Sequence, residues 1–424
     1  MPNSWSNNSF SSYKMVLNHI FVAFFLVSLI VALVRFIVFG DVSVFDEMVQ
    51  ASFSQSKNAF EIALALTGVL ALWLGLMKIA ERSGLIGKLA QVSSPILSRL
   101  FPSVPKDHPA LGNIFMNISA NLLGLDNAAT PLGIRSMESL QTINQQKDKA
   151  SDAMIMFLAI NASGLTLIPS SIMAYRLQAG AANPADIFVP ILIATFASTL
   201  VAILAVGIRQ RINFLQRPLL LFLLSSLLFI GGIIYAGRTL PPETFSSIST
   251  AFASILLFGI MCGFVVSGLR ARINVYNAFI EGAKDGFGTA VTIIPYLLAM
   301  LVGIGIFRAS GAMDLITEGL RKLIDFFGGD MKFVEGIPTM LMKPLSGSGA
   351  RGLMVDAMQT HGADSFVGRL CSIVQGSSDT TFYVVALYYG AVKIRNTRYT
   401  VSYSLLADLA GALTAIAVTY IFFG

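Results

Sequence analysis

The sequence predicts an all-α, polytopic integral membrane protein with inverted-topology repeats, each containing a re-entrant helical hairpin. Hydrophobic residues make up 55% of the 424 residues and charged residues only 12%, whereas a soluble domain carries about 25% charged residues. Several apolar runs reach the roughly 20 residues that a spanning helix needs. These runs lack the period-two alternation of a transmembrane β-barrel, and three sequence blocks recur in the same order in the two halves.

Nine apolar segments are predicted to cross the membrane. They lie near residues 17–39, 59–80, 151–175, 185–208, 218–237, 248–269, 288–308, 365–389 and 401–423. Lysine and arginine favour cytoplasmic loops, and here they gather in the loops 209–217, 270–284 and 392–399. The acidic loop 41–57 and the loop 237–243 are therefore expected outside, with a cytoplasmic N-terminus and an external C-terminus.

Two further stretches are predicted to be re-entrant hairpins. The basic residues before and after the stretch of about 107–146 are both expected inside, so this stretch must enter and leave on one face. Its tip is expected near GLDNAATP (124–131). The stretch of about 337–360 is expected to dip in from the opposite face. Interrupted backbone at such depth is tolerated only where protein or a water-filled cavity satisfies its polar groups.

The two hairpins belong to matching halves of the sequence. The matched pairs are residues 81–102 with 307–328, NAATPLG (127–133) with SGSGARG (346–352), and NASGLTLIP (161–169) with QGSSDTTFY (375–383). By the charge argument, the two copies cross the membrane in opposite directions. Inverted repeats with paired interrupted helices are typical of secondary transporters, whose substrate sites lie near the bilayer midplane.

The hairpin tips supply the first candidate site residues. Asn127, Thr130, Ser346 and Ser348 are predicted to bind substrate, and Asp126 is a candidate for ion or proton coupling. Exposed N–H groups at half-helix N-termini carry partial positive charge, which suits a polar ligand. Two simpler interpretations remain open, because Asn127 and Thr130 are also good helix caps and SGSG is also a common turn sequence.

Polar clusters in the middle of two apolar spans supply the remaining candidates. The predicted substrate-binding residues there are Asn161, Ser163, Thr166, Gln375, Ser378 and Thr380. Asp379 is the second candidate for ion or proton coupling, with Na⁺ or H⁺ as the ion and no other cofactor expected. Polar groups at that depth face the protein interior and often mark a pathway. The alternatives are an Asp379–arginine pair and threonine hydroxyls that bond back to their own helix.

The basic residues near the hairpins leave the charge of the solute open. They are Arg135, Lys343, Arg351 and Arg369, opposite Glu138, Asp356 and Asp364. An unpaired arginine suits a carboxylate or phosphate on the solute. If all of them are paired with protein carboxylates, a neutral solute is favoured.

The sequence carries no pattern typical of catalysis or metal binding. The histidines at 19, 108 and 361 are scattered, and Cys262 and Cys371 lie in apolar segments without a CxxC motif. There is no HExxH motif and no P-loop ending in Lys-Ser/Thr. The net charge of +6 is attributed to cytoplasmic loops and not to nucleic-acid binding.

At this point the motifs resemble a known pair of protein families. GLDNAATPLGIRSMESLQ (124–141) and NASGLTLIPSSIMAYR (161–176) resemble the spore maturation protein A family, although that motif has glycine in place of Asp126. KPLSGSGARGL (343–353) and QGSSDTTFY (375–383) resemble the spore maturation protein B family. The chain resembles a fusion of the two over roughly 60–400. Both belong to the nucleoside-recognition "gate" group, which is similar to concentrative nucleoside transporters.

The resemblance implies an elevator-type transporter. It implies amphipathic interface helices at 84–101 and 311–327, a homo-oligomer, and a bacterial inner-membrane location. The expected function is secondary transport of a small polar solute, and the alternative is a membrane scaffold or sensor that has lost transport. The expected domains are an N-terminal scaffold helix with external loop (1–57), a first gate repeat (58–176), linking scaffold helices (177–286), a second gate repeat (287–400) and a C-terminal helix (401–424).

Overall fold

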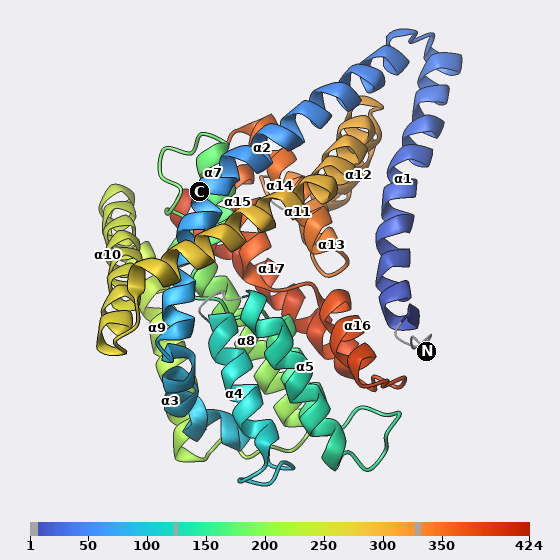
Figure 1. Ribbon diagram of the computed structural model, residues 1–424. Coiled ribbons are helices and arrows are strands. Elements are labelled where there is room, and N and C mark those ends of the chain that lie inside the picture. Colours follow the sequence, from blue (N-terminus) through green and yellow to red (C-terminus); the bar gives the residue numbers. More distant parts are fainter. Residues whose placement is uncertain (1–6, 123–125, 327–331) are drawn as a thin grey trace.

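The computed structural model describes residues 7–122, 126–326 and 332–424, and these are almost entirely helical (Figure 1). Within those ranges, six helices are long and apolar enough to cross a membrane. The prediction of a polytopic, all-α membrane protein is therefore confirmed. The six segments are Asn18–Phe39 of α1, Ser43–Arg82 (α2), Phe188–Arg209 (α8), Arg217–Ala236 of α9, Ser247–Arg270 of α10 and Thr400–Phe423 (α17).

Two helices extend well beyond the predicted spans. Helix α2 is 40 residues long and begins at Ser43, so the prediction of a loop at 41–57 is wrong. The helix continues through this stretch because residues 43–58 contain no proline or glycine to interrupt it. Helix α11 (Val275–Ala309) begins thirteen residues before the predicted segment 288–308, since the Asn274 side chain caps it by accepting from the Asn277 N–H.

The described chain repeats the same order of elements in its two halves. A long helix is followed by an amphipathic helix, a pair of helices, an interrupted helix and a second long helix. In the first half these are α2, α3 (Leu85–Leu100), α4 (Pro109–Leu122) with α5 (Asp126–Ile143), α6 (Asp152–Ala162) with α7 (Ser170–Gln178), and α8. In the second half they are α11, α12 (Ala312–Phe326), α13 (Ile337–Met342) with α14 (Gly347–His361), α15 (Phe366–Ser377) with α16 (Thr381–Ala391), and α17.

The corresponding long helices pack against each other in opposite directions. Gly282 of α11 lies against Leu74 of α2, whereas Gly305 lies against Gln55 near the other end of α2. The same reversal occurs between α8 and α17, because Ser198 donates to the Ala407 carbonyl (3.0 Å) while Arg209 lies 5.8 Å from the ring of Tyr399. Small residues permit this close approach, as is usual between membrane helices.

The paired helices lie toward opposite ends of the molecule in Figure 1, α4 and α5 below and α13 and α14 above. Helices α4 and α5 are antiparallel, since Asn113 bonds Ser139 (3.0 Å) and Asn117 bonds the Ala129 carbonyl (2.7 Å). Helix α14 begins where the Ser346 hydroxyl accepts from the Gly349 N–H. The amphipathic helices predicted at 84–101 and 311–327 appear as α3 and α12.

The remaining helices, α9 (Arg217–Thr239) and α10 (Pro242–Arg270), connect the two halves. Their outward faces are apolar and exposed: Leu228 is 75% exposed and Ile255 is 74% exposed. Helix α1 (Asn7–Phe39) stands at one edge of the molecule in Figure 1. Apolar side chains this exposed need a lipid environment or a partner surface, as expected for a membrane protein.

Candidate functional site

The two segments 151–175 and 365–389 are each interrupted where the sequence places polar residues. Helix α6 ends at Ala162 and α7 starts at Ser170, because Gly164 adopts a positive φ of 62° and Pro169 has no N–H to continue a helix. Helix α15 ends at Ser377, where Ser378 turns into an extended conformation, and α16 starts at Thr381. Each expected continuous span is therefore two half-helices.

The two interruptions cross each other in direct contact. The Asp379 N–H donates to the Ala162 carbonyl at 2.8 Å. A Cβ on Gly164 would lie 2.6 Å from the Asp379 nitrogen, so only glycine fits there. Residues more than 200 positions apart in the sequence thus form one interrupted-helix crossing.

Each helix pair bonds to the interrupted helix of its own half. The Leu167 N–H donates to the Leu122 carbonyl at the end of α4 (2.9 Å), and the Phe382 N–H donates to the Pro344 carbonyl between α13 and α14 (3.2 Å). These bonds satisfy backbone groups that the interruptions expose, which a membrane interior requires.

A cavity of about 470 Å³ lies at the crossing. This volume is in the range of small-molecule sites, about 300–1,000 Å³. One wall is apolar and comes from α2, through Leu70, Trp73 and Leu74. The other walls come from the helix pairs and interrupted helices and carry the polar side chains Asn121, Thr130, Asn161, Thr166, Lys343, Arg351, Gln375, Ser378 and Asp379.

Amide side chains hold the first half of the site in place. Asn121 donates to the Asn161 oxygen (2.9 Å), and Asn161 donates to the Phe157 carbonyl (2.9 Å). Asn117 is fully buried and donates to the Ala129 carbonyl in α5. These bonds fix the relative positions of α4, α5 and α6 around the cavity.

Gln375 presents an unused acceptor at the cavity. The residue is 7% exposed, and its Nε2 lies 3.5 Å from the Gly347 carbonyl. Its Oε1 is buried and has no hydrogen-bond partner among the described residues. A buried acceptor without a donor costs free energy, so a solute N–H or O–H at this position would be favourable.

The cavity contains charges of both signs. Asp379 is exposed and lines it, and no ion pair joins Asp379 to another described residue. Arg351 lies 5.7 Å from the ring of Tyr175. Lys343 is buried, lines the same cavity and makes further contacts of its own. Among the described residues, the charged lining therefore consists of two cations and one carboxylate.

Half of the predicted site residues line this cavity. They are Thr130, Asn161, Thr166, Gln375, Ser378 and Asp379. Thr130 lies within α5, which begins at Asp126, so Thr130 is not a helix cap. The Thr166 hydroxyl donates to the Gly164 carbonyl inside the interruption (3.1 Å). The side chains of Asp126 and Asn127 lie outside the described residues.

Four other predicted residues lie beside the cavity lining in the described structure. Ser163 is fully buried, donates to the Ile160 carbonyl and bonds the Thr199 hydroxyl (3.0 Å). Ser346 caps α14, whose first three residues are Gly347, Ser348 and Gly349, so the turn interpretation of the SGSG sequence is wrong. Ser348 lies 3.3 Å from the Ser346 hydroxyl, and Thr380 is 3% exposed.

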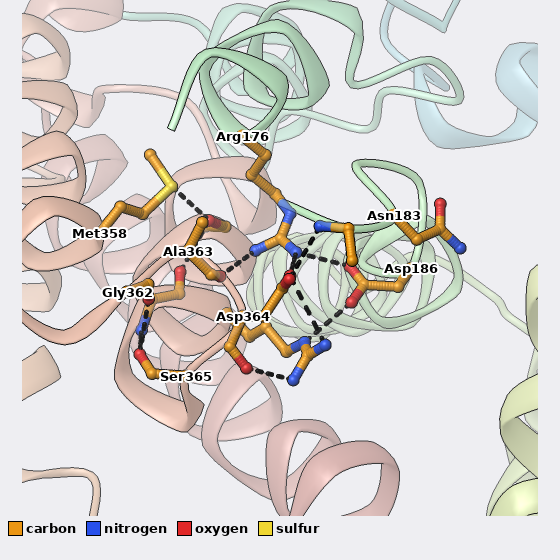
Figure 2. Close-up of polar contacts among 12 residues, drawn as sticks. Arg176, Asn183, Asp186, Met358, Gly362, Ala363, Asp364 and Ser365 are labelled. Carbon is orange, nitrogen blue, oxygen red and sulfur yellow. Dashed lines mark hydrogen bonds and ion pairs between the residues drawn. The ribbon is translucent and has the colours of Figure 1, made fainter. Parts of the chain in front are cut away.

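An ion-pair cluster that sequence reasoning did not identify links the two halves (Figure 2). Arg176 is fully buried and donates to the Ala363 carbonyl (2.7 Å), to Asp186 (2.9 Å) and to Asp364 (2.9 Å). Arg369 also bonds Asp186, at 2.8 Å. Arg369 is one of the four basic residues near the hairpins whose pairing the sequence left open, and it is paired with a protein carboxylate. The sequence signal that could have indicated this cluster is Arg176 itself, a charged residue directly after the apolar segment 151–175.

A second set of contacts links the two halves at the opposite end of the interrupted helices. Arg398 pairs with Asp152 at 2.6 Å. The Ala150 N–H donates to the Asn396 carbonyl (2.9 Å), and the Asn396 N–H donates to the Asp148 carbonyl (3.0 Å). With the cluster around Arg176, these contacts join the interrupted helices of both halves into one body.

Comparison with known proteins gives one family for most of the chain. A family model described as "Gate: Nucleoside recognition" matches residues 63–273 and 290–395, more than half of the chain. Spore maturation protein A of Bacillus subtilis (strain 168) is 46% identical over 155 residues, 37% of this chain and 79% of that protein. Spore maturation protein B of the same organism is 39% identical over 182 residues, 43% of this chain and 98% of that protein.

Proposed function

The chain belongs to the Gate family of nucleoside-recognition proteins and combines regions similar to spore maturation proteins A and B, and on this basis we propose that it is a secondary transporter of a small polar solute. The observation that carries the proposal is the contact between the two helix interruptions, Asp379 N–H to Ala162 carbonyl, beside a polar cavity. Crossed half-helices around a polar site are the usual architecture of transporter sites.

The two halves are inverted repeats in the membrane, and α4–α5 and α13–α14 are re-entrant hairpins from opposite faces. The antiparallel packing of α2 with α11 and of α8 with α17 supports this arrangement. So does the placement of the two helix pairs toward opposite ends of the molecule (Figure 1). We assign the protein to a bacterial inner membrane. The loops 210–216 and 271–274 are cytoplasmic in this arrangement, because five arginines lie in or directly beside them: Arg209, Arg211, Arg217, Arg270 and Arg272.

The mechanism is an elevator-like movement. The hairpins and interrupted helices are joined by the Arg176 cluster and the Arg398–Asp152 pair, and they move as one body against a scaffold that contains α2 and α11. The apolar wall of the cavity, Trp73 and Leu74, belongs to that scaffold. A weakly interacting apolar wall lets the polar body slide past it with its solute. The scaffold pairs with that of a second copy.

The solute binds through amides, hydroxyls and charges on the moving body. Asn161 and Gln375 supply hydrogen bonds, and Arg351 with Lys343 outweighs Asp379, which favours a neutral or acidic solute. The other predicted substrate-binding residues lie at the hairpin tips and helix interruptions, and we keep them as candidates for contact with the solute. They are Asn127, Thr130, Ser163, Thr166, Ser346, Ser348, Ser378 and Thr380. Transport is driven by Na⁺ or H⁺, for which Asp126 and Asp379 are the first candidates.

The test begins with binding and continues with flux. A panel of small polar solutes is screened by thermal shift of the purified full-length protein, with and without Na⁺ and at several pH values, because a bound ligand stabilises by mass action. Hits are then assayed for uptake into proteoliposomes. Gln375→Ala, Asn161→Ala and Asp379→Asn should each lower uptake at least about tenfold, which corresponds to about 1.4 kcal/mol.

The control is Ser225→Ala, which removes an exposed hydroxyl on α9 and should leave uptake unchanged. Unchanged uptake in all three cavity variants would overturn the assignment of the site. The alternative function, a membrane scaffold or sensor with the same fold, predicts stabilisation by a solute without flux of that solute in either direction.

A further inference from the structure

One acidic residue in the second half lies behind the cavity wall and has no part in the solute site. Asp408 is in the apolar helix α17 and is 5% exposed. A carboxyl group at such a position is costly in a membrane protein and is usually functional. Neither its sequence context, SLLADLAGAL, nor the repeat pattern singled it out.

The contacts of Asp408 place it against the second interruption. Its Oδ2 accepts from the Thr381 hydroxyl at 2.6 Å, at the first residue of α16. The Ser378 hydroxyl, which lines the cavity, interacts with the same carboxyl group. The Asp408 Oδ1 is buried and has no hydrogen-bond partner in the described part of the chain.

The charged groups that act on this carboxyl have opposite signs. They are Lys343, which stabilises a negative charge there, and Asp379, which opposes one. Helix α16 has no charged residue. The other helices packed on α17 carry their charges at or near the helix ends, at Asp152 of α6, Arg209 of α8, Arg217 and Arg238 of α9, Glu243 and Arg270 of α10, and Arg369 of α15.

The first half shows that bracing an interruption does not require an acid. There, α8 occupies the place of α17, and the Thr195 hydroxyl donates to the Gly164 carbonyl at 2.9 Å. A neutral hydroxyl is therefore sufficient for the structural role. The buried carboxyl of Asp408 calls for a different explanation.

We propose that Asp408 is a reversible proton-binding site adjoining the solute cavity. The carboxylate accepts one proton from water in the cavity, an O–H bond forms on Oδ1, and the same proton returns to water when that bond breaks. Protonation removes a buried negative charge, which is the main cost of this arrangement. Its use as the coupling site rests on the transport function proposed above, whereas proton binding itself does not.

The position of the site lets solute and proton influence each other. Ser378 contacts both the cavity and Asp408, and Asp379 lines the cavity while opposing a charge on Asp408. A solute that neutralises or displaces Asp379 makes release of the proton from Asp408 easier. Solute binding and proton binding are then coupled through Asp379 and Asp408.

The test measures thermal unfolding of the purified full-length protein at a series of pH values. An ordinary aspartate in the unfolded chain loses its proton near pH 4. If folded Asp408 keeps its proton to higher pH, the folded state binds more protons over that interval and stability falls as pH rises. Asp408→Asn should remove this transition, together with the protonated-carboxyl band in a pH-difference infrared spectrum.

Two further variants give the direction of the effect. Thr381→Val removes the hydroxyl that stabilises the carboxylate and should move the transition to higher pH. Asp379→Asn removes a repulsive charge and should move it to lower pH. Because these variants retain Asp408, they test the site even if Asp408→Asn does not fold.

An unchanged pH transition and infrared band in Asp408→Asn would overturn the proposal. So would a transition that responds to NaCl against KCl at fixed pH and not to pH, because the bound ion would then be Na⁺. If Asp408→Asn removes the transition but no solute is transported by the wild type, the proton site stands and only the transport function fails.

Discussion

Gly164 occupies the tightest point of the crossing between the interrupted helices, and it allows a sharp test. Gly164→Ala puts a Cβ 2.6 Å from the Asp379 nitrogen and keeps a positive φ of 62°. The conformational strain alone costs about 1–2 kcal/mol, and the clash with backbone adds to it. We expect a clearly lower unfolding temperature and loss of solute-induced stabilisation, measured by thermal shift.

Two alanine variants separate the causes of this effect. Gly180 has a φ of 79° and open space around its Cα, so Gly180→Ala reports strain without a clash. Gly112 lies in α4 with open space and no positive φ, so Gly112→Ala should be neutral or slightly stabilising. Equal effects of Gly164→Ala and Gly180→Ala would mean that the close contact at the crossing contributes nothing.

Arg176 carries a second prediction at this scale. Its side chain is fully buried between Asp186 and Asp364 (Figure 2). Arg176→Gln leaves two carboxylates without that partner, and loss of one member of a buried ion pair typically costs about 3–5 kcal/mol. The unfolding temperature, measured by following helix content during heating, should fall strongly.

The matched control for Arg176 is Arg82→Gln, which breaks an ion pair with Glu281 in which both side chains are exposed, at 47% and 43%. Exposed pairs contribute about 0–1 kcal/mol, so this variant should unfold close to the wild type. If both arginine variants unfold at the same temperature, the buried cluster does not hold the two halves together.

At the scale of elements, the packing of α2 against α11 determines how the two halves meet. A Cβ on Gly282 would lie 2.2 Å from the Leu74 carbonyl oxygen. Gly282→Leu should therefore separate these helices and destabilise the protein. Overpacking typically costs about 1–3 kcal/mol, and we expect at least that loss. Gly259→Leu, on the open face of α10, is the control and should leave the unfolding temperature unchanged.

The helix boundaries show which elements a sequence specifies. The amphipathic helices α3 and α12 and the tight connection between α9 and α10 agree with the sequence, because periodicity and proline are local signals. The start of α2 at Ser43 differs from the sequence, since hydropathy detects the apolar part of a helix and not its polar extension. For this reason the sequence predicts a loop at residues 43–57, which form part of α2.

At the scale of the whole molecule, the proposed inverted arrangement leads to a labelling prediction. In a Cys262→Ala background, single cysteines replace Leu215 and Arg272 in the loops with arginine, Thr239 at the end of α9, and Thr142 and His361 at the bases of the helix pairs. Positions 215, 272 and 142 should react with an impermeant thiol reagent from the cytoplasmic side of inverted vesicles. Positions 239 and 361 should react from the opposite side.

Two controls accompany the labelling. The native Cys371 is fully buried and should stay unlabelled while the protein is folded. Each variant is also labelled after detergent permeabilisation, where every introduced cysteine should react. Reaction of positions 142 and 361 from the same side in intact vesicles would exclude hairpins that enter from opposite faces.

The sequence alone determined the membrane class, the two helix pairs, the amphipathic helices and six of the residues that line the cavity, because hydropathy, charge asymmetry and polar residues within apolar runs are local properties. Only the tertiary structure decided that Asp379 meets Ala162, that Gln375 has an acceptor unused by any described residue, and that Arg176 and Asp408 are buried. The physical reason is distance along the chain. These contacts join residues from different helices, and no pattern within one helix records which backbone its side chains will face after packing.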